Sequence, residues 1–143
     1  MFDITFTGTR TGMTKEQTSS LFRHLSHLLK KKGGIHFHHG GCRGADRQAH
    51  GVATMVSIPI TVHPGDTSQS VFFQDRACKV EAVQPYLERN WNMVKTATLV
   101  IACPSSYLEE LRSGTWATIR YARKQKKELW IILPDGTTAK ERR

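Results

Sequence analysis

A continuous apolar run at residues 98–104, with the sequence TLVIACP, constrains the fold of this chain more than any other feature. A run without polar interruption is typical of a strand that is buried on both faces of a parallel sheet. A turn of small residues, 113–115, comes a few residues later and leads into the amphipathic segment 116–122. This order is typical of α/β proteins, in which the start of a helix offers unpaired N–H donors and partial positive charge to an anion.

The rest of the chain alternates between strand and helix patterns. This alternation predicts an α/β fold: a single Rossmann-like, doubly wound and mainly parallel sheet of about five strands with helices on both faces. We expect one domain at residues 1–136 and a basic C-terminal tail at 137–143, with residues 66–84 irregular. The expected strands are 2–7, 35–39, 56–62, 98–103 and 128–133, and the expected helices are 14–32, 46–55, 85–95 and a fourth from about 114.

Two more glycine-containing turns follow predicted strands. They are residues 7–10, with the sequence TGTR, and residues 39–46, with the sequence HGGCRGAD. Right-handed crossovers place the carboxyl ends of parallel strands along one edge of the sheet, and ligands of such sheets bind there. The repetition of small-residue turns at this edge predicts a nucleotide-type site.

Length, apolar runs and cysteine content exclude several other classes of protein. The 143 residues suit one domain, and no apolar run approaches the roughly 20 residues that span a bilayer. The N-terminal sequence MFDITF lacks the basic region of a signal peptide. Cys42, Cys78 and Cys103 are odd in number and lack paired spacing, so we expect no disulfide framework and a cytoplasmic location.

The formal net charge of +9 favours an anionic partner. Lysine-rich segments at 30–32 and 123–127 fall at expected helix C-termini, where the helix dipole favours cations. Part of the charge therefore has a local explanation. The remainder fits a nucleotide ligand or, as an alternative, nucleic acid, whereas nothing in the sequence indicates a membrane.

Short motifs after the predicted strands occur in a definite order along residues 2–136. They are Gly8-Thr9-Arg10, the segment 40–46 (GGCRGAD), His63-Pro64-Gly65, Arg89-Asn90 with Met93, Cys103-Pro104 and Ser113-Gly114-Thr115. Their joint order resembles the SLOG superfamily, most closely its small YpsA-like branch. Relatives include the Lonely Guy cytokinin-activating phosphoribohydrolases, the molybdenum cofactor carrier protein and the DNA-processing protein DprA.

The resemblance implies a Rossmann-like fold that binds a nucleotide or nucleotide derivative across these turns. It assigns Gly40, Gly41 and Gly44 to a tight turn and places Arg43 near phosphate. Arg89 resembles the arginine that Lonely Guy enzymes use beside the sugar. Relatives commonly dimerise through helices that flank the site, so the resemblance also implies a homodimer.

The resemblance leaves the choice between binding and catalysis open. Gly114 and Thr115 match the phosphate-binding helix start, but Thr118 occupies the position of the catalytic Glu in the hydrolase motif GGxGTxxE. This departure favours a sensor, carrier or sequestering protein for a nucleotide-derived molecule. An N-glycosidic, phosphoribohydrolase-like hydrolase is the alternative, and a DprA-like nucleic-acid binder is the second alternative.

Hydrolysis of a glycosidic bond needs a carboxylate that positions or deprotonates water. The candidates are Asp46, Asp75, Glu109 and Glu110. Asp46 fits a helix N-cap equally well, and the two glutamates, which lie in the insertion 105–113, fit solvated loop acids.

The histidine-rich strand region and Cys42 suggest two further kinds of site. No Cys-x-x-Cys or His-x-x-x-His pair accompanies the histidines, so packing is favoured over a metal, although His39 and His63 are placed to touch a ligand. A helix N-terminus beside Cys42 would lower the pKa of its thiol. Trp116 fits either base stacking or core packing, and Trp91 is expected in the core.

These arguments define the expected site, with a nucleotide as ligand or substrate and no further cofactor or metal. The expected catalytic residues are Arg89, Asp46, Glu109 and Glu110. The expected ligand contacts are Gly8, Thr9, Arg10, Gly40, Gly41, Cys42, Arg43, Gly44, His63, Pro64, Asn90, Ser113, Gly114, Thr115 and Trp116.

Overall fold

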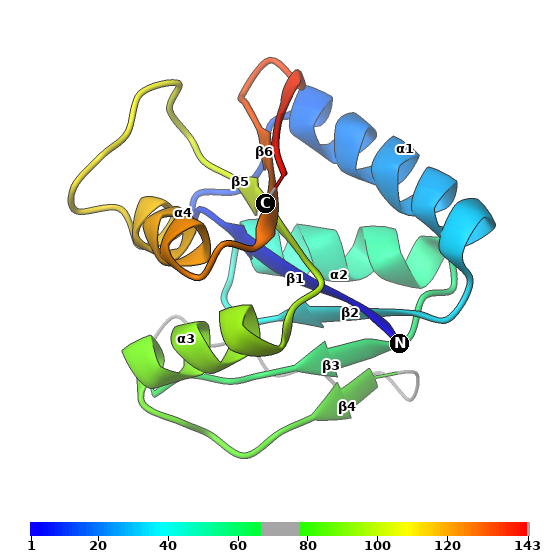
Figure 1. Ribbon diagram of the computed structural model, residues 1–143, viewed down its shortest axis with the longest axis horizontal. Helices are drawn as coiled ribbons and strands as arrows, with labels where there is room; N and C mark the ends of the chain where they lie inside the picture. Colours follow the sequence, from blue (N-terminus) through cyan, green and yellow to red (C-terminus); the bar gives the residue numbers. More distant parts are fainter. Residues whose placement is uncertain (67–77, 143) are drawn as a thin grey trace.

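The computed structural model describes residues 1–66 and 78–142, and in them seven strands form one sheet with four helices packed on it (Figure 1). The strand order is β4-β3-β2-β1-β5-β6-β7, and every pairing is parallel except that of β6 with β7. The elements are β1 (Phe2–Gly8), α1 (Lys15–Lys32), β2 (Ile35–His39), α2 (Ala45–Met55), β3 (Ile60–Val62), β4 (Cys78–Val80), α3 (Tyr86–Thr96), β5 (Leu99–Cys103), α4 (Gly114–Lys124), β6 (Glu128–Ile132) and β7 (Thr138–Glu141).

The predicted α/β class, with a Rossmann-like and mainly parallel sheet, is confirmed, and two edge strands extend it. β4 forms in the region expected to be irregular, and β7 forms in the segment expected to be a tail. Both are short and largely polar or exposed, so they lack the apolar pattern of the central strands. β3 begins only at Ile60, because α2 ends at Met55 and Ser57 takes a left-handed conformation with φ of 62°.

The sheet carries a hydrophobic core on each face. Helices α1 and α2 cover one face and α3 and α4 cover the other, as Figure 1 shows. Alternation along β5 supplies both cores, because Leu99 and Ile101 pack on the first while Val100 and Ala102 pack on the second. This double burial explains the uninterrupted apolar sequence of β5. None of the helices in the described ranges combines the length and apolar character needed to cross a membrane.

The N-terminus of α1 is fastened to the ends of two strands. Thr14 and Gln17 form a capping box, with both reciprocal hydrogen bonds at 3.0 Å. The buried Gln17 side chain also donates through Nε2 to the carbonyl oxygens of Pro104, at 2.7 Å, and Ile132, at 2.9 Å. The cap therefore holds α1 against the carboxyl ends of β5 and β6.

The turns after β1 and β2 are in direct contact at the edge where the parallel strands end, which we call the carboxyl edge. Ala45 N–H donates to the carbonyl of Thr9 at 2.9 Å. Gly44 has φ of 82°, and a Cβ atom there would meet the carbonyl oxygen of Arg10. Glycine is required at this position for both its backbone conformation and its lack of a side chain.

We predict that Gly44→Ala lowers the free energy of unfolding by about 2 kcal/mol or more, because it combines left-handed backbone strain with a backbone clash. Gly51→Ala is the matched control, since Gly51 lies within α2 and a Cβ there meets nothing within 4 Å. Alanine at residue 51 raises helix propensity and should stabilise the protein by up to about 1 kcal/mol. Urea unfolding of both variants tests this, and similar effects would contradict it.

Candidate functional site

A cavity of about 570 Å³ opens at the carboxyl edge of the sheet. It lies between the turns after β1 and β2, the first half of α3, and the segment that connects β5 to α4. Twelve of the residues predicted from the sequence line it: Gly8, Thr9, Arg10, Gly40, Cys42, Asp46, Arg89, Asn90, Glu110, Ser113, Gly114 and Thr115.

The start of α4 presents unpaired hydrogen-bond donors to this cavity. Ser113 caps the helix by accepting the Trp116 N–H at 3.2 Å, which leaves the N–H groups of Gly114 and Thr115 without intrahelical acceptors. The Thr115 side chain is only 4% exposed, and its hydroxyl has no hydrogen-bond partner within the described residues. A Cβ at Gly114 would meet the Tyr86 hydroxyl, so glycine lets α3 approach. This helix start is suited to an anion.

Arg89 is a buried cation that joins three elements. Its Nη1 donates to the carbonyl oxygens of Gly40 and, at 2.7 Å, of His63, while its Nε donates to Asn90 Oδ1 at 2.7 Å. The guanidinium also lies 5.1 Å from the centre of the Tyr86 ring. α3 is thereby tied to the carboxyl ends of β2 and β3.

The remaining nitrogen of Arg89 is available to a ligand. Nη2 has one polar contact among the described residues, Cys42 Sγ at 3.9 Å, which is a weak acceptor. The side chain is 2% exposed and lines the cavity. A buried guanidinium nitrogen with spare N–H donors is a strong site for a phosphate or carbonyl oxygen.

Asp46 places a buried carboxyl group beside Arg89. The N-cap of α2 is Gly44, so the N-cap hypothesis for Asp46 is wrong, and its Oδ2 instead accepts the Cys42 N–H at 3.2 Å. Burial raises the pKa of Asp46 to about 6, although hydrogen bonds from the turn and the charge of Arg89 oppose the shift. The carboxyl group can therefore gain or lose a proton near neutral pH.

Cys42 does not have the properties of an activated nucleophile. Burial and the neighbouring Asp46 raise the pKa of its thiol, and the charge of Arg89 only partly opposes them. The hypothesis of a thiol with a lowered pKa is therefore wrong for this environment.

The histidines of β2 form packed pairs. His39 Nδ1 accepts the Gly41 N–H at 3.0 Å, so the proton lies on Nε2, which donates to His50 Nδ1 at 2.8 Å. Burial first, then His50, lowers the pKa of His39 to about 3, which keeps the ring neutral. Through the Gly41 N–H, the His39–His50 pair helps to hold the turn at residues 40–44. On the other face, His38 bonds to His63 at 2.9 Å.

The described residues contain no group of three His, Cys, Asp or Glu side chains that could hold a metal ion. Asp75, one of the candidate carboxylates, lies outside the described ranges.

Seven predicted site residues do not line the cavity. Arg43 is exposed, whereas Cys42 and Asp46 of the same turn line the cavity. The Trp116 ring is buried in the core with Ile119 and donates to Ser106 Oγ. The seven are Gly41, Arg43, Gly44, His63, Pro64, Glu109 and Trp116.

Trp91, which was expected in the core, is 45% exposed.

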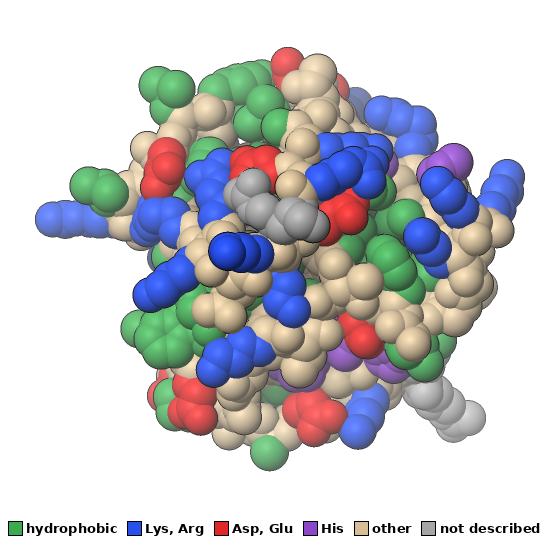
Figure 2. Space-filling model, in the orientation of Figure 1, with side chains coloured by type: hydrophobic (Ala, Val, Ile, Leu, Met, Phe, Trp, Pro, Cys, Tyr) green, Lys and Arg blue, Asp and Glu red, His purple; other side chains and the backbone are tan. Residues whose placement is uncertain are grey.

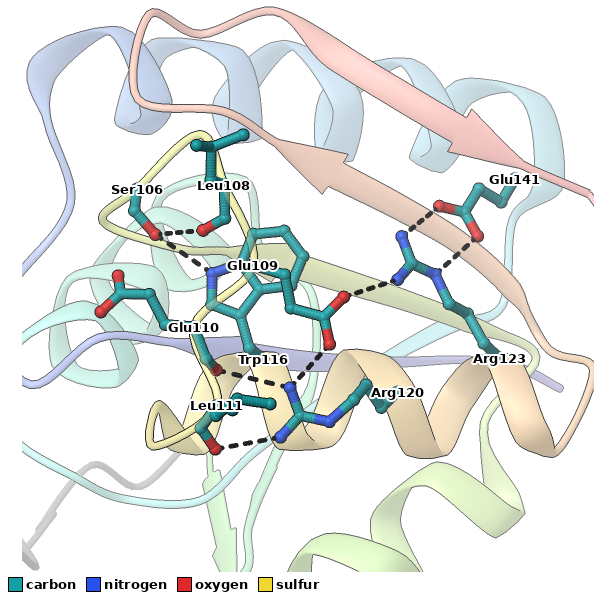
Figure 3. A network of polar contacts seen from close by, with 9 residues as sticks. All are labelled: Ser106, Leu108, Glu109, Glu110, Leu111, Trp116, Arg120, Arg123 and Glu141. Carbon is teal, nitrogen blue, oxygen red and sulfur yellow. Dashed lines mark hydrogen bonds and ion pairs between the residues drawn. The ribbon is translucent and has the colours of Figure 1, made fainter.

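Glu109, predicted as a possible catalytic carboxylate, is instead bonded to the surface of α4. Its carboxylate lies 2.8 Å from Arg120 Nη1 and 3.8 Å from Arg123 Nη1 (Figure 3). The other glutamate of the insertion, Glu110, lines the cavity.

Thr7 belongs to the predicted turn at 7–10 but was not among the expected ligand contacts, and Tyr86 and Arg112 were not predicted as site residues; all three line the cavity. Thr7 shares a sheet face with Thr5 by strand alternation, so its position had a signal in the sequence. Tyr86 and Arg112 carried none, because their positions depend on how α3 and the insertion fold.

Comparisons with known proteins identify the fold. Neither a family model nor a curated protein matches the sequence. The molybdenum cofactor binding protein of the phototrophic bacterium Rippkaea orientalis is similar over 92% of this chain and 76% of its own, with a TM-score of 0.69 and 18% identity.

Two further solved structures agree. TM1055 is similar over 90% of this chain and 72% of its own, with a TM-score of 0.65 and 15% identity. The molybdenum cofactor carrier protein of Chlamydomonas reinhardtii is similar over 91% of this chain and 75% of its own, with a TM-score of 0.64 and 15% identity. These similarities show a shared α/β fold, as expected from the sequence.

The raised pKa of Asp46 predicts a pH dependence of stability. The folded protein retains a proton on Asp46 between its ordinary pKa of 3.8 and about 6, whereas the unfolded chain loses it. Ionisation of Asp46 therefore lowers the free energy of unfolding as the pH rises through this window, by up to about 3 kcal/mol. Asp46→Asn removes this contribution.

The measurement is urea unfolding of the wild type and of Asp46→Asn at pH 4 and pH 7.5. The variant should gain stability relative to the wild type as the pH rises, while the histidine contributions cancel because both proteins contain them. A difference that stays constant with pH would contradict the assignment.

Proposed function

We propose that this protein binds a nucleotide or nucleotide-derived small molecule at the carboxyl edge of its sheet, as a sensor, carrier or sequestering protein. One observation carries the proposal: two sets of unsatisfied donors, each including a buried side chain, face the same cavity. They are the first turn of α4, with the hydroxyl of Thr115, and the Nη2 group of Arg89.

The chemistry of the cavity favours a phosphate at the start of α4. Backbone N–H groups and the Thr115 hydroxyl supply short-range donors, and the helix dipole adds partial positive charge. Arg10 and Arg112 also line the cavity and contribute cationic side chains at its exposed part. A phosphate monoester matches this combination of donors and charge.

The rest of the cavity suits the sugar and base of a nucleotide. Hydroxyl groups of Thr7 and Thr9 and the carboxyl group of Asp46 provide acceptors and donors for ribose oxygens. A volume of about 570 Å³ falls within the range typical of small-molecule sites. Two of the structurally similar proteins are described as binding or carrying the molybdenum cofactor, which supports a small molecule as the ligand.

A second candidate function is N-glycosidic hydrolysis of a nucleotide. Asp46 favours it, since a buried carboxyl group with a pKa of about 6 beside a ligand cavity has the properties of a general base. Thr118 lines the cavity where the hydrolase motif has its glutamate, and its hydroxyl donates to the carbonyl of Gly114. Another carboxyl group of the cavity would therefore have to take over that role, and this candidate assigns it to Asp46.

The nucleic-acid hypothesis rests on the net charge of +9. On the face in Figure 2, Lys and Arg side chains are distributed over the surface with Asp and Glu side chains among them. Phosphate-backbone binding depends steeply on salt, whereas binding in a cavity depends on it less, so a salt titration separates the two. A homodimer and a cytoplasmic location stay predictions.

The proposal predicts that Thr115→Val weakens the binding of a nucleoside monophosphate about tenfold, because a buried hydroxyl donor to phosphate is lost while side-chain volume is kept. Thr54→Val is the control, since Thr54 lies in the last turn of α2 and its hydroxyl donates to the His50 carbonyl, away from the cavity. Isothermal titration calorimetry of both variants measures the effect. Equal affinities for the two variants would contradict a phosphate site at α4.

The hydrolase candidate predicts release of free base from a nucleoside monophosphate. Asp46→Asn should then lower the rate of release by at least about 100-fold while binding is retained. Native mass spectrometry and chromatography of the incubated mixture measure both. An intact bound nucleotide with no free base would reject hydrolysis and leave the binding function.

A further inference from the structure

The segment between β5 and α4, residues 105–113, lies over the cavity and exposes apolar side chains. Leu108 is 81% and Leu111 is 86% exposed. Figure 1 shows the segment projecting from the sheet beside α4, and Figure 2 shows hydrophobic side chains protruding in the same region. Glu110, Leu111 and Arg112 line the cavity.

Arg120 of α4 holds this segment by three contacts. Its Nη1 donates to the Glu109 carboxylate at 2.8 Å and to the Glu110 carbonyl at 3.4 Å. Its Nη2 donates to the Leu111 carbonyl at 3.3 Å. Figure 3 shows the guanidinium reaching three consecutive residues of the segment. Only the planar fork of arginine matches acceptors in this arrangement.

Two further contacts fix the same segment. Ser106 Oγ accepts from Trp116 Nε1 at 3.2 Å and donates to the Leu108 carbonyl at 2.9 Å. Arg123 lies 3.8 Å from Glu109 and is itself held by Glu141 of β7 at 2.7 Å. Because the segment has no helix or strand of its own, these contacts determine which residues it presents to the cavity.

Apart from Arg112, the side chains that residues 105–112 present to the cavity differ in chemistry from the phosphate-binding end. Leu111 is largely exposed although it lines the cavity, and Leu87 of α3, 53% exposed, also lines it. The Glu110 carboxylate has no hydrogen bond or ion pair within the described residues. Two apolar side chains and an open carboxylate are suited to a flat ring that bears N–H donors.

We infer that residues 105–113 are a specificity loop, positioned by Arg120, that selects a nucleotide whose base carries an exocyclic amino group. Leu87 and Leu111 cover the ring, and Glu110 accepts the amino N–H. This inference rests on the proposed nucleotide site and adds to it the part of the ligand that the loop recognises. Arg120 is a positioning residue, since it holds the loop and does not line the cavity.

The test compares ligands that share a phosphate but differ in the base. Adenosine, cytidine and uridine 5′-monophosphates and ribose 5-phosphate are titrated into the wild type and Arg120→Gln. Arg120→Gln should weaken binding of the two amino-bearing nucleotides about tenfold and leave ribose 5-phosphate within about twofold. Lys124→Gln is the control, because Lys124 is an exposed residue at the end of α4 and contacts no residue of the loop within the described ranges.

A second variant tests the loop without disturbing its anchor. Glu110→Ala should reduce the preference for adenosine and cytidine monophosphates over uridine monophosphate by about tenfold. Arg120→Lys keeps the charge but not the fork, so it should behave as Arg120→Gln does.

Three results separate the possible failures. If Arg120→Gln lowers the affinity for ribose 5-phosphate as much as the affinity for the nucleotides, or lowers neither, the inference of a specificity loop is wrong. A wild type that binds uridine monophosphate as tightly as the amino-bearing nucleotides also overturns it, while the proposed nucleotide site stands. A wild type that binds none of the four compounds overturns the proposed function itself.

Discussion

The buried guanidinium of Arg89 is the interaction on which the carboxyl edge of this protein depends. It satisfies the carbonyls of Gly40 and His63, at the ends of β2 and β3, and holds α3 against them. A buried cation is costly unless its N–H groups are paired, and these carbonyls provide the pairing. The same geometry leaves Nη2 facing the cavity beside Cys42, so one side chain both organises the edge and offers a donor to a ligand.

Two glycines, Gly44 and Gly114, let other segments of the chain approach closely at the carboxyl edge. Gly44 lets the turn after β2 lie against the turn after β1, and Gly114 lets the start of α4 lie against Tyr86 of α3. The cavity is therefore bounded by backbone and short side chains near the strands. The insertion at residues 105–113 forms its outer part, with Arg120 anchoring it. We propose that the turns at the carboxyl edge bind the anionic part of the ligand, while the insertion recognises the rest of it.

The central strands and the turns could be predicted from the sequence, because double burial and glycine conformation leave direct patterns in it. The edge strands β4 and β7 could not, since their stability comes from pairing with a neighbour rather than from their own apolar residues. Within the site, the sequence indicated that arginines bind the ligand, but it did not indicate which way each side chain points. Arg43 faces solvent and Arg89 faces inward, which depends on how each backbone segment packs. Glu109 lies outside the cavity for the same reason, because its contacts with Arg120 and Arg123 depend on how the insertion packs on α4.

The central claim is that an anionic ligand binds at the start of α4 beside Arg89. The most direct measurement is a crystal structure of the protein with adenosine 5′-monophosphate. The claim predicts phosphate oxygens within hydrogen-bond distance of the Gly114 and Thr115 N–H groups and of the Thr115 hydroxyl. A phosphate bound instead at the exposed side chain of Arg43, with the α4 turn empty, would contradict it.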